Sequence, residues 1–369
     1  MPSGTAMRPL PSWRRKIMVQ GMHSIARVAL IFLFLLFEGP SLSLAQDARA
    51  ALQTLVRSAQ SALEAGDLAR AEADFERARA VAPDNLEANR GLLLTYLEAG
   101  KLDQAEELGT QAAARWPQDA QILHWLGLVY FKTGRAPQAL EALRRSEKLD
   151  PGHADIHFDI ALVLLENRQY SPAAEELEQS IKLKPSQALA HVLLGRAYQN
   201  TNRTVEAIEQ FQTALRIDPE LPLGHYHLGF AYASMGRNPE AIAEYEKELV
   251  RSPDNADVRY ELGHCLLETG DWKEAIMQLK RATELNAQNA DAAYDLGKAL
   301  LLDGHADTAI PALRRAIALN PNDPSPHYQL ARALEKTGNA DEAKLELERF
   351  AQLKKAQAQT GGMATGRIQ

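Results

Sequence analysis

The chain has 369 residues, a formal net charge of −7 and a single cysteine. The acidic balance argues against nonspecific nucleic-acid binding, which needs a basic footprint, and one cysteine excludes an intramolecular disulfide. Aromatic residues make up only 6% of the chain, which favours a core of closely packed aliphatic side chains.

The N-terminal segment has the pattern of an export signal. Basic residues precede an apolar run from Val28 to Phe37, and Ser43-Leu44-Ala45 offers the small residues that signal peptidase reads. The apolar run is ten residues long, whereas a membrane-spanning helix needs roughly 20. We therefore predict a signal peptide over residues 1–45, a short linker over residues 46–51, and a periplasmic or extracellular location. An uncleaved segment that anchors the chain in the membrane is the alternative.

Removal of the signal peptide would make the mature chain more acidic. Residues 1–45 hold five basic residues and one acidic residue, so the formal net charge would fall from −7 to −11. That balance favours solubility and leaves only local basic patches to attract acidic partners.

Beyond the N-terminal segment, an alanine recurs with a fixed period of 34 residues. A period of this size indicates one supersecondary unit stacked on copies of itself. The nine alanines are Ala71, Ala105, Ala139, Ala173, Ala207, Ala241, Ala275, Ala309 and Ala343.

Each period predicts two helices, as the unit over residues 290–323 illustrates. Leu296 belongs to the apolar face of the first helix, which Gly304 ends because glycine adopts the left-handed conformation at little cost. Ala309 lies in the second helix, which Pro321 ends because proline lacks an amide hydrogen. We expect the alanine where the two helices cross, since close crossing requires a small side chain.

Several positions depart from the repeat columns. Asn202 replaces the glycine between helices and tolerates the left-handed region, whereas Arg168 at the same place predicts a locally different turn. Gly109 replaces an aromatic residue of the second helix. Glu248 replaces a small residue, so we expect disturbed packing there. Cys265 stands in a column of small residues and is predicted to be buried.

The repeat resembles the tetratricopeptide repeat. The unit from Ala188 to Leu221 carries that family's residues at the family's spacing, namely Leu194-Gly195, Tyr198, Ala207, Phe211, Ala214 and Pro219. The resemblance covers residues 52–357, as eight full units and a ninth, cap-like unit. It implies an all-α fold, a right-handed superhelical solenoid of antiparallel helix pairs. Residues 358–369 are predicted to be a disordered tail.

The resemblance also implies that the first helices line a concave groove, into which the second, fifth, ninth and twelfth positions of each unit project. In the last four units, the fifth and ninth positions form what we call the aromatic–basic strip: Tyr226, Phe230, Tyr260, His264, Tyr294, Lys298, Tyr328 and Arg332. In units two to four, the corresponding positions form what we call the apolar trough: Leu94, Leu128, Phe158 and Leu162.

The composition of the strip suggests how it would bind a peptide. Tyrosine offers contact area and a hydroxyl group at low entropic cost, and arginine can hold a carboxylate through two hydrogen bonds. We therefore predict that the strip binds an extended segment with acidic side chains. Tyrosine at the fifth position is also common in the family, so packing within the repeats is the structural alternative.

The sequence carries no catalytic signature, since it has no phosphate-binding loop, no zinc-protease helix motif and no nucleophile elbow. One cluster of metal-ligating residue types occurs, but its members point to different sides: His153, Asp155, His157 and Asp159. Three histidines recur at one repeat position, namely His157, His191 and His225. They lie on helices roughly 8–10 Å apart and cannot share a zinc ion, which binds nitrogen at about 2.0–2.1 Å. We expect these histidines to replace the family's packing aromatic residue.

We therefore predict a non-enzymatic scaffold or adaptor that binds protein segments outside the cytoplasm, with no cofactor and no metal. Two alternatives remain open. One is an assembly factor anchored in the inner membrane by its N-terminal segment. The other is a structural protein that associates with copies of itself. The partner's identity and the oligomeric state are left open.

Overall fold

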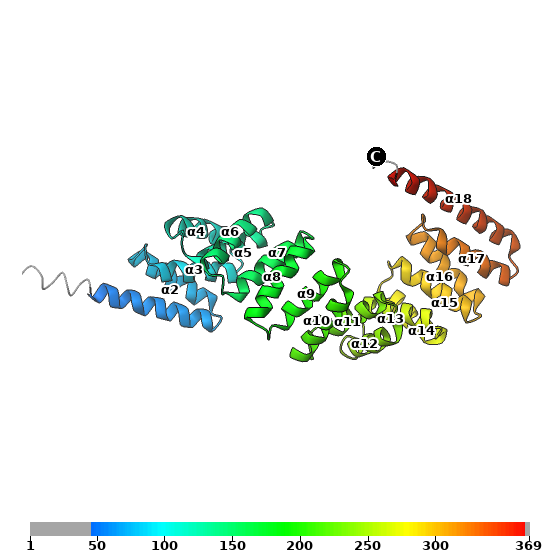
Figure 1. The fold of residues 1–369 in the computed structure, drawn as a ribbon, viewed down its shortest axis with the longest axis horizontal. Helices are drawn as coiled ribbons and strands as arrows, with labels where there is room; N and C mark the ends of the chain where they lie inside the picture. Colours follow the sequence, from blue (N-terminus) through cyan, green and yellow to red (C-terminus); the bar gives the residue numbers. More distant parts are fainter. Residues whose placement is uncertain (1–45, 366–369) are drawn as a thin grey trace, which may run out of the picture. The chain divides into compact units, whose positions relative to one another are not determined.

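The computed structural model describes residues 46–365, with side chains up to residue 359. Every regular element in this part of the chain is an α-helix, and consecutive helices pack against each other as antiparallel pairs (Figure 1). The predicted all-α solenoid of helix pairs is therefore confirmed. The helices belong to two compact units that divide after Asp150.

The first unit contains a helix over residues 46–64, α2 (Leu68–Val81), α3 (Leu86–Glu98), α4 (Leu102–Arg115), α5 (Ala120–Lys132) and α6 (Ala136–Leu149). The second unit contains α7 (Ala154–Glu166), α8 (Tyr170–Leu183), α9 (Ala188–Asn200), α10 (Thr204–Ile217), α11 (Gly224–Ser234), α12 (Asn238–Arg251), α13 (Ala256–Thr269), α14 (Trp272–Leu285), α15 (Ala290–Leu302), α16 (Ala306–Leu319), α17 (Pro324–Lys336) and α18 (Ala340–Thr365). Odd-numbered helices are the first helices of their repeats, and even-numbered helices are the second helices.

The repeat columns explain where the helices begin and end. Asn289 accepts a hydrogen bond from the amide of Ala292 at 2.9 Å and so caps α15, because its side chain satisfies an amide that has no partner in the helix. Gly304 follows α15 with a φ of 90°, the left-handed conformation expected of it. The nine periodic alanines are all buried, at 0–1% exposure, as a close crossing of two helices requires.

Two local expectations concern single residues. Arg168 has a φ of 57° and Asn202 a φ of 61°, so both adopt the left-handed turn that glycine adopts elsewhere. The expectation of a different turn at Arg168 is wrong: the surrounding helix pair imposes this turn, although the left-handed region costs a non-glycine residue roughly 1–2 kcal/mol. Cys265 is 1% exposed, and burial raises the pKa of its thiol to about 12, as expected of a packed core residue.

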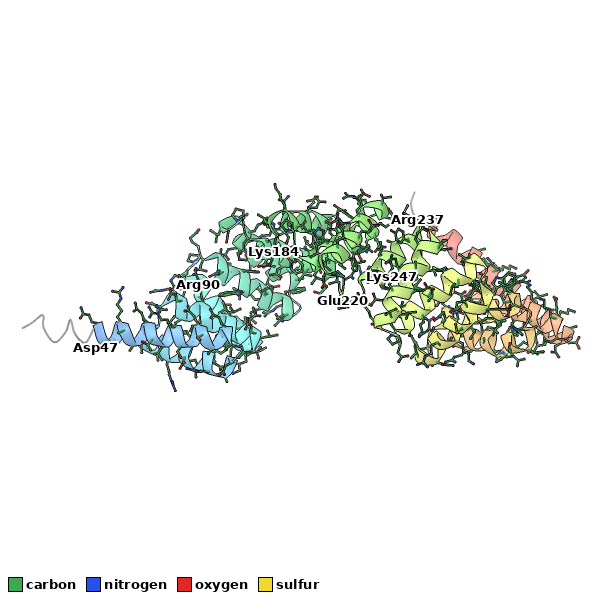
Figure 2. All side chains as sticks on the ribbon, turned by 90° about the horizontal axis from the view of Figure 1, so that it is seen from below. Asp47, Arg90, Lys184, Glu220, Arg237 and Lys247 are labelled. Atoms are coloured by element: carbon green, nitrogen blue, oxygen red, sulfur yellow. The ribbon has the colours of Figure 1, made fainter. Side chains whose placement is uncertain are left out.

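The boundaries of the array differ from the sequence prediction at both ends. Residues 46–51, predicted to be a linker, are helical, and Asp47 already lies on the first helix (Figure 2). At the other end, α18 continues to Thr365, past residue 357 and into the segment predicted to be a disordered tail. The helix pattern was underestimated there because alanine and glutamine favour helix without marking an apolar face.

The predicted signal peptide, residues 1–45, lies outside the described residues. Among the helices of residues 46–365, none combines the length and the apolar character that crossing a bilayer demands.

The expected disturbance at Glu248 is present. Glu248 is 1% exposed, on α12, and α11 has eleven residues, whereas α9 and α15 have thirteen each. The residue before α11, Leu223, has a φ of 60°. α11 therefore begins two residues later in its repeat than α9 and α15 do, and the amide of Leu223 bonds Glu248 there.

Candidate functional site

First helices lie on the inner side of the second unit. In that unit, α11 contacts α13, α13 contacts α15, and α15 contacts α17, in addition to the contacts that join each helix to the next along the chain. The second helices of neighbouring repeats make no comparable contacts there. The stack is therefore tighter along its first helices, which is the arrangement that gives solenoids their concave binding surfaces.

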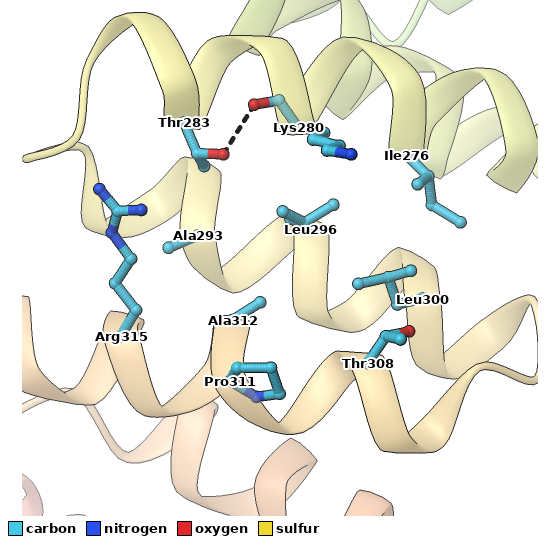
Figure 3. Close-up of a pocket in the computed structure, with 10 residues that line it drawn as sticks. All are labelled: Ile276, Lys280, Thr283, Ala293, Leu296, Leu300, Thr308, Pro311, Ala312 and Arg315. Carbon is cyan, nitrogen blue, oxygen red and sulfur yellow. Dashed lines mark hydrogen bonds between the residues drawn. The ribbon is translucent and has the colours of Figure 1, made fainter.

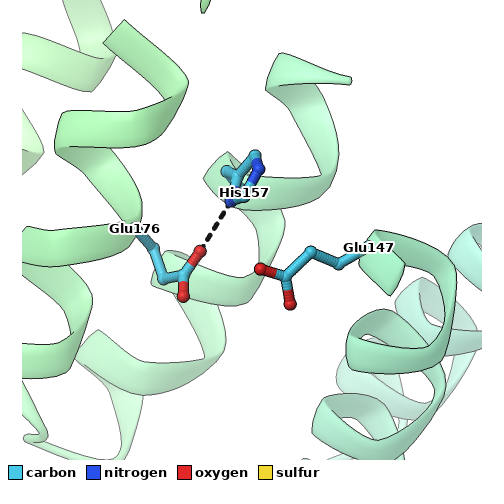
Figure 4. A group of neighbouring side chains, drawn as sticks. All are labelled: Glu147, His157 and Glu176. Carbon is cyan, nitrogen blue, oxygen red and sulfur yellow. Dashed lines mark hydrogen bonds and ion pairs between the residues drawn. The ribbon is translucent and has the colours of Figure 1, made fainter. Parts of the chain in front are cut away.

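A polar pair joins the first and second helix of most repeats in this unit. His157 Nδ1 bonds Glu176 Oε2 at 2.7 Å (Figure 4), and His157 Nε2 lies 3.2 Å from the carbonyl oxygen of Pro151. The partner is always 19 residues away, as in His191–Gln210 at 2.8 Å, His225–Glu244 at 2.5 Å, Arg259–Gln278 at 2.6 Å and His327–Glu346 at 2.5 Å. The recurring histidines are thus packed between helices, as predicted, and each also has a bonded partner in its own repeat.

The structure places the aromatic residues of the strip on the inner first helices, and part of their surface is accessible. Tyr226, Tyr260 and Tyr294 are half-buried, whereas Phe230 and Tyr328 are exposed at 43% and 42%. The rings pair along each helix: Tyr226 lies 6.4 Å from Phe230, and Tyr260 lies 6.1 Å from His264.

The basic residues of the strip already have partners within the chain. Lys298 Nζ lies 3.1 Å from Glu268 Oε1. His264 Nδ1 lies 2.8 Å from Asp295 Oδ2, and this hydrogen bond raises the pKa of His264. Both contacts join α15 to α13. These cations therefore stabilise the stacking of neighbouring first helices and are less available to carboxylates of a ligand.

The third basic residue, Arg332, lies on α17, where its Nη1 donates to Gln329 Oε1 at 3.1 Å.

Acidic side chains lie near Tyr226 and Tyr260, and the sequence reasoning missed them. Burial raises the pKa of Tyr260, and the nearby carboxylates of Asp295, Asp291 and Glu261 raise it further. Burial likewise raises the pKa of Tyr226, with contributions from Glu261 and Asp257. The signal was present in the second and sixth positions of the repeats.

Glu261 is the most informative of these acids. It is half-buried on α13, and burial raises the pKa of its carboxyl group. Among the described residues, no hydrogen bond or ion pair satisfies it. Five carboxylates lie on α13 and α15 around the strip, whereas the strip has two cations there, Lys298 and His264. The carboxylates belong to Glu261, Asp257, Asp291, Asp295 and Glu268. The surface is therefore acidic and aromatic.

The residues of the predicted apolar trough divide between the two units. In the first unit, Leu94 and Leu128 are half-buried, and Leu128 packs against the core. In the second unit, Leu162 also packs against the core, and Phe158 is 9% exposed within it. The assignment of Phe158 to a ligand surface is corrected accordingly, because its ring is used in packing between helices.

Models of the tetratricopeptide repeat match most of the chain. One model matches residues 56–120, 93–154 and 158–222, and a second matches residues 232–301 and 300–359. No curated protein matches the chain.

Solved structures show the same kind of likeness over part of the length. A crystal structure of MamA is 27% identical, with a TM-score of 0.43, over 45% of this chain and 97% of that chain. YrrB, described as a TPR protein with an unusual peptide-binding site, is 23% identical, with a TM-score of 0.46, over 51% and 96%. A tetratricopeptide repeat protein from Parabacteroides merdae is 18% identical, with a TM-score of 0.47, over 68% and 99%.

Proposed function

Because the chain belongs to the tetratricopeptide repeat family, we propose that it is a non-enzymatic scaffold that works outside the cytoplasm and holds a partner's peptide segment on the inner side of its second unit. Stacked repeats of this kind are protein-interaction modules with extended binding surfaces. The half-exposed tyrosines at one repeat position of α11, α13, α15 and α17 support this use.

The charge of the surface favours a partner with lysine or arginine side chains. The expectation of an acidic segment relied on the basic residues of the strip, Lys298, Arg332 and His264. Lys298 and His264 are paired with carboxylates of the chain, whereas Arg332 bonds the neutral side chain of Gln329. The observation that carries the revised proposal is Glu261, a half-buried carboxylate without a bonded partner beside Tyr260. A cationic side chain here would satisfy Glu261 through a charge-assisted hydrogen bond and would contact the face of a tyrosine ring.

Selection of a random peptide library on the purified mature protein tests this function. We expect enrichment of peptides that combine lysine or arginine with apolar residues. The double variant Glu261→Gln/Asp291→Asn should bind a selected peptide with an affinity at least about tenfold lower, because hydrogen bonds to charged groups contribute about 1.5–3 kcal/mol each. The double variant Tyr260→Ala/Tyr294→Ala should also bind the peptide with lower affinity. Fluorescence anisotropy measures these affinities.

A matched control is Glu246→Gln, which removes one exposed carboxylate from the second helix α12 and should leave the affinity unchanged. Circular dichroism confirms that each variant is folded. Enrichment of acidic peptides, or full affinity in a folded Glu261→Gln/Asp291→Asn variant, would contradict the proposed surface.

Export is the second part of the proposal, and it is supported by the basic and apolar pattern of residues 1–45. When the full chain is expressed in a bacterium with a general secretion pathway, the mature protein should begin at Gln46. N-terminal sequencing of the periplasmic fraction measures this directly. A full-length chain that stays in the membrane fraction would favour the anchored assembly factor instead.

A further inference from the structure

A pocket opens on the side of the second helices, away from the strip. It lies between α14 and α16, above α15, and has a volume of about 460 Å³ (Figure 3). Ligand pockets in proteins typically measure about 300–1,000 Å³. Leu296 and Leu300 of α15 form its floor, and Ile276 and Pro311 flank it.

The pocket is present where one repeat lacks the polar pair found in the others of its unit. Position four of the repeat is histidine or arginine elsewhere in the unit, with a glutamate or glutamine 19 residues later. In the repeat over residues 290–323, these positions are Ala293 and Ala312, and both line the pocket. Loss of two long, mutually bonded side chains leaves space that no neighbouring residue fills.

The polar groups of the pocket favour an anion. Arg315 and Thr283 lie at one end, whereas Ile276 and Leu300 lie toward the other (Figure 3). Arg315 Nη2 donates to the carbonyl oxygen of Ala287 at 2.7 Å, which positions the guanidinium. Lys280 adds a second cation, whose ammonium group lies toward the other end, near Ile276 (Figure 3). No carboxylate lines the pocket, and neither cation has an ion pair among the described residues.

The first unit provides a natural comparison. Its repeat over residues 120–153 also lacks the polar pair, and a pocket of about 430 Å³ lies between α4 and α6. Arg145, at the repeat position of Arg315, lines it together with Glu141 and Tyr130. The carboxylate and the bulky ring there oppose an anionic, apolar ligand.

We propose that the pocket between α14, α15 and α16 binds a small apolar molecule that ends in a carboxylate, such as a medium-chain fatty acid. The carboxylate pairs with Arg315, and the apolar chain lies over Leu296 and Leu300. The pocket and the strip use different residues of α15, Leu296 and Leu300 in the pocket and Tyr294 in the strip.

Isothermal titration calorimetry with decanoate and decanol tests the assignment. The mature protein should bind one decanoate and should bind decanol at least about tenfold more weakly, because the alcohol cannot form the charge-assisted hydrogen bonds. Arg315→Gln should reduce decanoate affinity by about tenfold and leave decanol binding unchanged. Arg145→Gln, the matched control, should bind decanoate as the unaltered protein does.

A second variant restores the missing pair. Ala293→His/Ala312→Glu should fill the pocket with the side chains that other repeats carry, and so should fold and bind neither ligand. The proposal is overturned if the unaltered protein fails to bind decanoate, if decanol binds equally well, or if the folded Ala293→His/Ala312→Glu variant retains decanoate binding.

Discussion

Replacing Gly195 with leucine is expected to lower the free energy of unfolding by about 3 kcal/mol. Gly195 is buried on α9, and a Cβ atom there would lie 2.5 Å from Cε1 of Phe211. Phe211 is itself 0% exposed on α10, so its ring has no free space to move into. Overpacking of a dense core typically costs about 1–3 kcal/mol, and the largest costs arise where the backbone must shift.

One repeat of the chain already contains the opposite arrangement. In the unit over residues 86–119, the position of Gly195 is Leu93, and the position of Phe211 is Gly109. A Cβ atom on Gly109 would lie 3.0 Å from Cδ1 of Leu126 and 3.3 Å from Cδ1 of Leu93, so Leu93, together with Leu126, occupies the space left by the missing aromatic. The double variant Gly195→Leu/Phe211→Gly should therefore be more stable than the sum of its single changes predicts.

A double-mutant cycle measured by urea unfolding gives the coupling between the two positions. Phe211→Gly alone should cost about 3–5 kcal/mol through cavity formation, and the coupling should offset at least about 1 kcal/mol of the combined loss. Arg196→Leu, at the exposed neighbouring position of the same helix, serves as the control and should change stability little. Strict additivity of the two changes would contradict direct packing of this pair.

The fold could be predicted from the sequence because each column has one local physical cause. Ala241 marks a helix crossing at 0% exposure, and Gly304 marks a left-handed turn. Arg168 shows the limit of this reasoning, since its turn is imposed by the packed helices on either side and its own preference is overridden. The ends of the array were harder to predict, because residues 46–51 have no preceding repeat to supply a pattern.

The sequence predicted where the tyrosines lie better than it predicted the charges around them. Tyr260 and Tyr294 lie on first helices of the second unit and are half-buried, and their role in binding stays a prediction. The pairs Lys298–Glu268 and His264–Asp295 join residues 30 and 31 positions apart, slightly less than one repeat. The residue columns of the repeat do not predict such contacts. The contacts depend on how far one first helix is shifted along its axis relative to the next, and only the structure gives this shift.

Glu248→Ala is expected to stabilise the protein by about 1–2 kcal/mol. Corresponding positions in the neighbouring repeats are Ala214 and Ala282, so alanine suits the site. Glu248 Oε1 accepts a hydrogen bond from the amide of Leu223 at 3.2 Å, but its Oε2 is buried without a partner in the part of the chain that the structure describes. An unsatisfied buried polar group costs about 1–3 kcal/mol, and more when it is charged.

Restoring alanine should also lengthen α11 by about two residues, to the length of α9 and α15, because Leu223 would leave its left-handed conformation. Thermal unfolding followed by circular dichroism should show a higher midpoint for Glu248→Ala than for the unaltered protein. Glu248→Gln keeps the size of the side chain and removes its charge, so its midpoint should lie between these two. Glu246→Ala, at an exposed position of the same helix, controls for helix propensity. A lower midpoint for Glu248→Ala would show instead that the hydrogen bond to Leu223 outweighs the cost of the unpaired oxygen.

The same variant connects the shortened helix to the aromatic–basic strip. Tyr226 lies only two residues after Gly224, the start of α11. A change in peptide affinity in Glu248→Ala would therefore indicate that the shortened helix positions one end of the strip.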